Sequence, residues 1–118
     1  MFKELLQDLV HRTDGGVAGL LMASDGLAID QYATGDGPFD IESVGMEYSV
    51  VLKGVQRAGE MLDTGSTKEV SVQTERLTTV VRMLTDEYFV AVAVAPGGNV
   101  GKARYLLRVS APALIENL

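Results

Sequence analysis

Residues 40–65, DIESVGMEYSVVLKGVQRAGEMLDTG, predict the longest helix of this 118-residue chain. Asp40 is suited to capping the start of the helix, because an aspartate oxygen accepts hydrogen bonds from the unpaired N–H groups of the first turn. The pair Thr64-Gly65 is typical of a helix end. We therefore expect a helix from about Ile41 to Leu62.

This helix carries two apolar faces. At 100° per residue, one set of side chains falls within roughly 80° of arc and should lie on a sheet: Ile41, Val44, Tyr48, Val51, Leu52, Val55, Gly59 and Leu62. A second set points in nearly the opposite direction: Met46, Val50, Gly54, Arg57 and Met61. Scattered exposed apolar residues are normal on a protein surface, which is the simpler interpretation. We favour a helix that is covered twice, once by its own sheet and once by another chain.

The residue types of the second face favour contact with a partner. A glycine inside a helix costs up to about 1 kcal/mol relative to alanine, unless close contact needs the missing side chain, and Gly54 stands in mid-helix. Methionines adapt to irregular surfaces. Arg57 can bury its aliphatic stem while its charge stays in water. A second copy related by a two-fold axis is the simplest partner.

Two strands are expected before the helix. Val17–Ala23 is apolar on both pleat faces, which is typical of a central strand covered on both sides. Ser24-Asp25-Gly26 is suited to a tight hairpin turn. Leu27–Thr34 carries polar residues in mid-run, so we interpret it as an edge strand.

Three strands are expected after the helix. Lys68–Glu75 places Val70 and Val72 against polar neighbours, which indicates an edge strand with one apolar face. This edge is a candidate for pairing with its twin, although its charged residues are equally suited to preventing such pairing. Leu77–Leu84 contains both apolar and polar residues. Tyr88–Ala95 is apolar on both faces and one face is small, so a helix should approach it closely.

Helices are expected at both ends of the chain. The first covers Phe2 to Val10, and the last begins after a capping Asn99. The buried stripe of the last helix should comprise Ala103, Leu106, Leu107, Ser110 and Leu114. Pro112 lacks a backbone donor and should kink or end this helix early.

The fold class is therefore α/β (α+β), with the topology α-β-β-α-β-β-β-α. Two central and two edge strands fit a five-stranded antiparallel sheet of order 2-1-5-4-3. Helices must cover both faces, because the central strands are apolar on both sides. We expect residues 1–118 to form a single domain.

Composition narrows the choice of function. The net charge is −6, and the ten basic residues are scattered along the sequence among sixteen acidic ones, which argues against nucleic acid and anionic membranes as partners. The absence of cysteine excludes disulfides and thiol chemistry. No apolar run approaches the roughly 20 residues of a membrane span, and the N-terminus does not resemble a signal peptide. We expect a cytoplasmic protein.

Motifs for catalysis are weak. Residues 96–103 superficially resemble a phosphate-binding loop, but proline and alanine stand at two of its four fixed positions. His11 is the sole histidine and lacks partners for a triad or a metal site. Ser24 lacks the preceding glycine of a nucleophile elbow. We expect no catalytic residue, no metal and no cofactor.

The opening hairpin GLLMASDGL, residues 19–27, and the closing segment GKARYLLR, residues 101–108, stand within a matching order of elements. On these grounds the chain resembles the Roadblock family, named for a dynein light chain, and its bacterial MglB type. The resemblance implies homodimers or heterodimers built on the central helix and the third strand. It also implies a role as scaffold or regulator of small Ras-like GTPases, with the MglB type accelerating GTP hydrolysis without an arginine finger.

The preferred hypothesis is a Roadblock-type homodimer that binds and regulates, or scaffolds, a small Ras-like GTPase. The residues expected at the dimer or partner interface are Met46, Val50, Gly54, Arg57, Met61, Val70 and Val72. The alternatives are a small-ligand sensor, a structural dimerisation scaffold without a GTPase, and a weak hydrolase assembled between subunits. No residue marks the protein as activator, exchange factor or passive scaffold.

Overall fold

The computed structural model describes residues 1–35 and 37–118, arranged as a sheet between two helical layers. The elements follow in the order α1 (Phe2–His11), β1 (Gly16–Ala23), β2 (Ala28–Ala33), α2 (Ile41–Leu62), β3 (Glu69–Gln73), β4 (Thr78–Met83), β5 (Tyr88–Val94) and α3 (Val100–Glu116). The strand order is β2-β1-β5-β4-β3, and every neighbouring pair is antiparallel. The predicted topology and sheet order are therefore confirmed.

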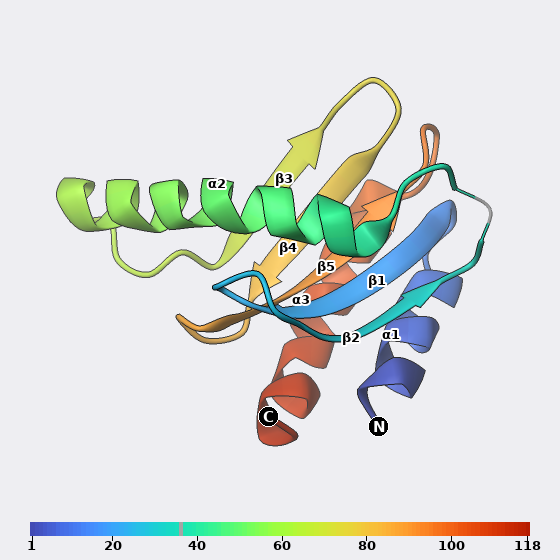
Figure 1. Cartoon of the computed structure of the whole chain (residues 1–118), viewed down its shortest axis with the longest axis horizontal. Coiled ribbons are helices and arrows are strands. Elements are labelled where there is room, and N and C mark those ends of the chain that lie inside the picture. Colours follow the sequence, from blue (N-terminus) through green and yellow to red (C-terminus); the bar gives the residue numbers. More distant parts are fainter. Residues whose placement is uncertain (36) are drawn as a thin grey trace.

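Helix α2 lies on one face of the sheet, and α1 and α3 lie on the other (Figure 1). The two chain termini belong to α1 and α3 and lie on that same side. Strands β1 and β5 are buried on both faces, as their sequences predict. Because successive side chains of a strand point to opposite faces of the sheet, β1 and β5 contribute side chains to two separate cores.

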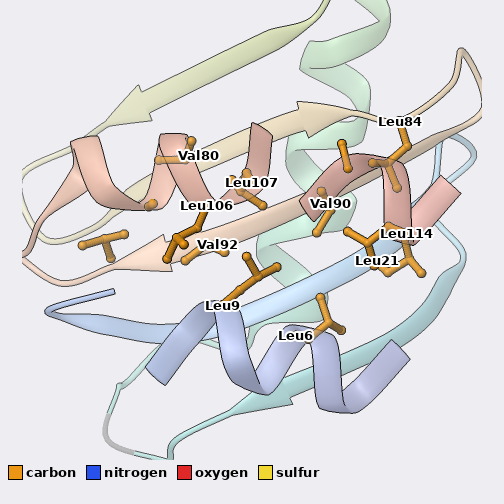
Figure 2. Close-up of a cluster of buried hydrophobic side chains, with 13 residues drawn as sticks. Leu6, Leu9, Leu21, Val80, Leu84, Val90, Val92, Leu106, Leu107 and Leu114 are labelled. Carbon is orange, nitrogen blue, oxygen red and sulfur yellow. The ribbon is translucent and has the colours of Figure 1, made fainter. Parts of the chain in front are cut away.

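The core beneath α1 and α3 is built from branched aliphatic residues. Figure 2 shows the side chains that meet in this layer: Leu6, Leu9, Leu21, Val80, Leu84, Val90, Val92, Leu106, Leu107 and Leu114. Withdrawing one such side chain from water stabilises the fold by about 1.5–3 kcal/mol. These contacts fix both terminal helices on the sheet.

The core beneath α2 is thinner, because β5 presents the small residues Ala91 and Ala93 there. Helix α2 contributes Gly45 to this layer, where an added Cβ would overlap the Leu20 side chain and lie within 3.1 Å of the Met22 sulfur. Small residues on both sides let the first half of α2 approach the sheet closely, as the alanines of β5 predict.

Pro112 does not end the last helix, so the prediction of an early end is wrong. Helix α3 continues to Glu116, four residues further. Leu114 is fully buried in the core beneath α1 and α3, as predicted. The buried stripe includes Ala111 in place of the predicted Ser110, which is only half-buried. Burial beyond the proline offsets the lost backbone hydrogen bond, which is worth about 1 kcal/mol.

Candidate functional site

Helix α2 begins and ends where its sequence predicts. The Asp40 carboxylate accepts a hydrogen bond from the Ser43 backbone N–H at 3.3 Å and one from its hydroxyl at 2.7 Å. At the other end, Asp63 adopts a left-handed φ of 58°, and the Thr64 N–H donates to the Gly59 carbonyl at 3.0 Å. Residues of the helix and its immediate flanks therefore supply the capping hydrogen bonds at both ends.

The second half of α2 is poorly covered by its own chain. The buried residues of this helix are Ile41, Gly45, Ser49 and Leu52, and none follows Leu52. Figure 1 shows the C-terminal turns of α2 extending beyond the strands. The second half thus stands largely in solvent, which is costly for a helix with apolar residues on two sides.

All five predicted interface residues of α2 are exposed. The side chains of Met46, Val50 and Met61 are 52%, 68% and 77% exposed, and Gly54 and Arg57 are exposed between them. Apart from the adjoining residues and the backbone of α2 itself, no atom of the described residues lies within 4 Å of a Cβ built at Gly54. Contacts inside the chain therefore give no reason for a glycine at this position.

Two residues assigned to the sheet face lie elsewhere. Val51 and Leu62 are 47% and 72% exposed, so the prediction that they face the sheet is wrong. The buried stripe instead includes Gly45 and Ser49. An apolar pattern does not find such small residues; their spacing of four from Ile41 is the signal that could have found them.

We define the α2 surface as the exposed residues Met46, Val50, Val51, Gly54, Arg57, Met61 and Leu62. Five of its members are large apolar side chains on one helix. Such a concentration differs from the single exposed apolar residues that most surfaces carry.

Strand β3 forms the edge of the sheet beside this helix. Val70 and Val72 are half-buried, and Val70 packs against the core beneath α2. They pair with Val81 and Thr79 of β4, while no strand of the described residues pairs with the other side of β3. The structure therefore places both valines on the same face of the sheet as α2, next to an open edge.

The motifs set aside on sequence grounds have structural explanations. Asn99 caps α3 by accepting a hydrogen bond from the Lys102 N–H at 3.0 Å, so the glycine-rich segment before it is a helix-capping turn. His11 is exposed and forms a 2.6 Å hydrogen bond between its Nε2 and the Tyr32 hydroxyl. Within residues 1–35 and 37–118, no group of three His, Cys, Asp or Glu could hold a metal ion.

A cavity of about 120 Å³ lies between the start of α2 and the sheet. Its lining is apolar and includes Val17, Phe39, Ile41, Val44 and Leu77. Typical small-molecule sites measure about 300–1,000 Å³ and carry a few convergent polar groups. This cavity gives little support to the small-ligand sensor.

Among the described residues, no helix has the length and apolar character needed to cross a membrane.

Comparisons with protein-family models and with curated proteins found no match.

Solved structures share the whole fold. The Roadblock/LC7 domain from Streptomyces avermitilis superposes with a TM-score of 0.85 at 17% identity, covering 98% of this chain and 95% of that chain. MglC from Myxococcus xanthus is 34% identical in sequence, covers 98% of this chain and 97% of that chain, and has a TM-score of 0.71. The chain belongs to the Roadblock/LC7 family.

Within this family the chain has an MglB-like fold. The gliding protein MglB from Thermus thermophilus superposes on this Roadblock chain with a TM-score of 0.84, covering 96% of this chain and 84% of that chain. Its sequence identity is 16%, which is below the 34% found for MglC. The resemblance drawn from the opening hairpin and the closing segment is thereby confirmed.

Proposed function

We propose that this Roadblock chain forms a homodimer through its α2 surface and strand β3, and that the dimer binds and regulates a small Ras-like GTPase in the cytoplasm. The observation that carries the proposal is the α2 surface itself. It gathers five exposed large apolar side chains around a glycine whose missing side chain would meet no described residue.

The energetics of this surface favour self-association. Each large apolar side chain withdrawn from water contributes at most about 1.5–3 kcal/mol. Two copies of the α2 surface, facing each other about a two-fold axis, would withdraw five such side chains from each copy. That gain is large enough to offset the cost of association, about 4–15 kcal/mol. Gly54 would let the two helix backbones approach closely.

Strand β3 would complete the interface. Its open edge presents unpaired backbone groups beside Val70 and Val72, and pairing with the same strand of a second copy would satisfy them. Self-association also has a parallel in the family, because one MglB structure, 17% identical to this chain, has a tetrameric arrangement.

Regulation of a GTPase rests on family membership. The Roadblock resemblance implies partners among Ras-like GTPases, which are themselves folded proteins. The chain would therefore act on its partner through surface contact. A dimer of α2 surfaces would form the platform for that contact.

The dimer is tested by light scattering at micromolar concentration, where the mass should be twice the 12.6 kDa of one chain. Val50→Lys should reduce the mass to that of one chain while the circular dichroism spectrum stays unchanged, because a charge replaces an exposed apolar contact. The matched control is Val109→Lys on α3, whose side chain is 47% exposed. A monomeric wild-type chain, or equal loss in both variants, would contradict the proposed interface.

Regulation is tested by GTP turnover of a Ras-like GTPase encoded beside this protein, measured with and without the dimer. An altered rate that is lost with Val50→Lys supports regulation through the α2 surface. Retention of the GTPase on the immobilised protein without a change in rate would indicate a scaffold. Neither binding nor a rate change would leave a dimerisation module and overturn the GTPase assignment.

A further inference from the structure

The fold gathers basic residues that are scattered along the sequence. A groove of about 460 Å³ lies between strand β3 and helix α3, and it is lined by Lys68, Glu69, Arg82, Gly101, Arg104, Tyr105 and Arg108. Four of these residues are basic and one is acidic, in a chain whose net charge is −6. The fold therefore brings together basic residues that are far apart in the sequence.

The groove exists because α3 covers the middle of the sheet and stops short of its edge. Val80 of β4 is buried beneath α3, whereas Ser71 and Gln73 of β3 remain exposed. Arg82 stands directly opposite Glu69 in the β3–β4 pair and forms the floor. Gly101, Arg104, Tyr105 and Arg108 form one wall, since residues at these spacings share a helix face.

The charges in this groove are incompletely neutralised. Glu69 accepts a hydrogen bond from Arg104 Nε at 2.9 Å, and Arg104 Nη2 forms an ion pair with the same carboxylate oxygen at 2.7 Å. The hydrogen bond and the charge of this carboxylate raise the pKa of Arg104 above its ordinary value. Because Glu69 is bound to Arg104, Arg82 loses the carboxylate that stands opposite it. No ion pair of the described residues involves Lys68, Arg82 or Arg108.

Arg82 carries a hydrogen-bond donor that the described residues leave without a partner. Its Nε is buried and has no hydrogen-bond partner among the described residues. A buried donor without a partner costs about 1–3 kcal/mol, and more when the group is charged. The Arg104–Glu69 pair shows that a carboxylate fits the guanidinium groups of this groove.

We propose that the groove between β3 and α3 binds an acidic segment of a partner protein, with Asp or Glu carboxylates on Arg82, Arg108 and Lys68. The groove is open, and its basic groups come from both walls and the floor. Arg104 and Arg108 alone are separated by about 6 Å along the helix axis. A single small anion cannot reach all of these groups, whereas successive carboxylates on an extended peptide can.

The remaining features of the groove also suit a peptide. The Arg108 guanidinium carbon lies 5.5 Å from the centre of the Tyr105 ring, which places it over the aromatic face. Tyr and Arg are among the residues that most often anchor protein interfaces. The acidic remainder of the molecule would repel a long polyanion such as nucleic acid, so the attraction acts on a short segment.

This site goes beyond the proposed function and is independent of it. The groove belongs to one chain and lies on the face opposite the α2 surface. Pairing through the outer edge of β3 would leave this face open.

The test uses a fluorescein-labelled hexaglutamate peptide and measures its fluorescence anisotropy with the full chain. Binding is expected in low-salt buffer and should weaken at about 0.15 M NaCl, where the screening length falls to about 8 Å. Arg108→Glu should weaken binding about tenfold, because it reverses an exposed charge at the contact. Lys68→Glu provides a second variant on the opposite wall.

The matched control is Lys3→Glu, which makes the same change of charge at an exposed site on α1. It should bind the peptide as the wild-type chain does, and all variants should keep the wild-type mass by light scattering. Absence of peptide binding would overturn the proposal, as would equal loss in Lys3→Glu. Binding of inorganic phosphate or phosphatidylserine vesicles in place of the peptide would overturn it too.

Discussion

Two glycines in helix α2 meet opposite surroundings, although both stand in regular helix. Gly45 faces the sheet, where an added Cβ would overlap Leu20, while Gly54 has no neighbour among the described residues within 4 Å of that position. Residue spacing places Gly54 on the outer face of α2, whereas the apolar pattern does not predict the burial of Gly45. Their mutation to alanine should therefore have effects of opposite sign on the isolated chain.

Gly45→Ala should destabilise the fold by about 1–3 kcal/mol, because the added methyl group overfills a closely packed contact. Urea denaturation of the Val50→Lys background measures this effect without a contribution from self-association. An unchanged unfolding midpoint would mean that Leu20 moves aside at little cost.

Gly54→Ala should stabilise the Val50→Lys chain by up to about 1 kcal/mol, since alanine is the better helix former. In the wild-type background the same change should weaken the dimer, because the methyl group would keep the two helices apart. Urea denaturation gives the first quantity and dilution light scattering the second. Equal affinity of the two dimers would show that Gly54 lies outside the interface.

At the scale of elements, the sequence predicts the strands of the sheet better than the orientation of α2. Apolar faces on Tyr88–Ala95 and a single apolar face on residues 68–75 suffice to place one strand centrally and the other at an edge. The face that α2 turns toward the sheet depends on Gly45 and Ser49. These two residues are buried by packing against the sheet, which the apolar pattern of the helix does not show. The continuation of α3 past Pro112 likewise depends on the core around Leu114.

Helix α2 should show two levels of hydrogen exchange. In Val50→Lys, amides of residues 56–62 should exchange faster than those of residues 45–52, because the second half of α2 has few buried contacts. In the wild-type chain at high concentration, the second half should gain protection. Mass spectrometry of peptides from these two ranges provides the measurement, and uniform protection in both proteins would contradict an uncovered helix end.

Pro112→Ala should raise stability, because alanine restores a backbone donor in the interior of α3. The gain should not exceed about 3 kcal/mol, the ordinary penalty of proline inside a helix. Thermal unfolding followed by circular dichroism measures it, with Ala113→Ser as a control for a neighbouring exposed position. A lower melting temperature would show that the proline is favourable where it stands.

For the whole molecule, folding and association should be coupled. A dimer that forms only from folded chains makes the melting temperature rise with protein concentration. Calorimetry over a hundredfold range should show this rise in the wild-type chain and in Val109→Lys. Val50→Lys should melt at one temperature throughout, and a wild-type chain that does the same would argue against the homodimer.

The two candidate surfaces differ in how far sequence can reveal them. The α2 surface comes from one helix, so residue spacing alone is enough to find Met46, Val50, Gly54, Arg57 and Met61. The groove between β3 and α3 joins residues 68, 82, 104 and 108, which are brought together by strand pairing and helix placement. In the sequence they stand in three separate segments, and only the fold turns them into a site.

The placement of the chain ends matters for how such surfaces are studied. Both ends lie on the side of the sheet that carries α1 and α3 (Figure 1). A tether at either end would therefore hold the molecule with α2 directed into solution, ready to capture analytes. The N-terminus precedes α1, whereas the basic groove is lined by α3 and β3. An affinity tag or biosensor anchor placed there would leave the α2 surface accessible in a single orientation.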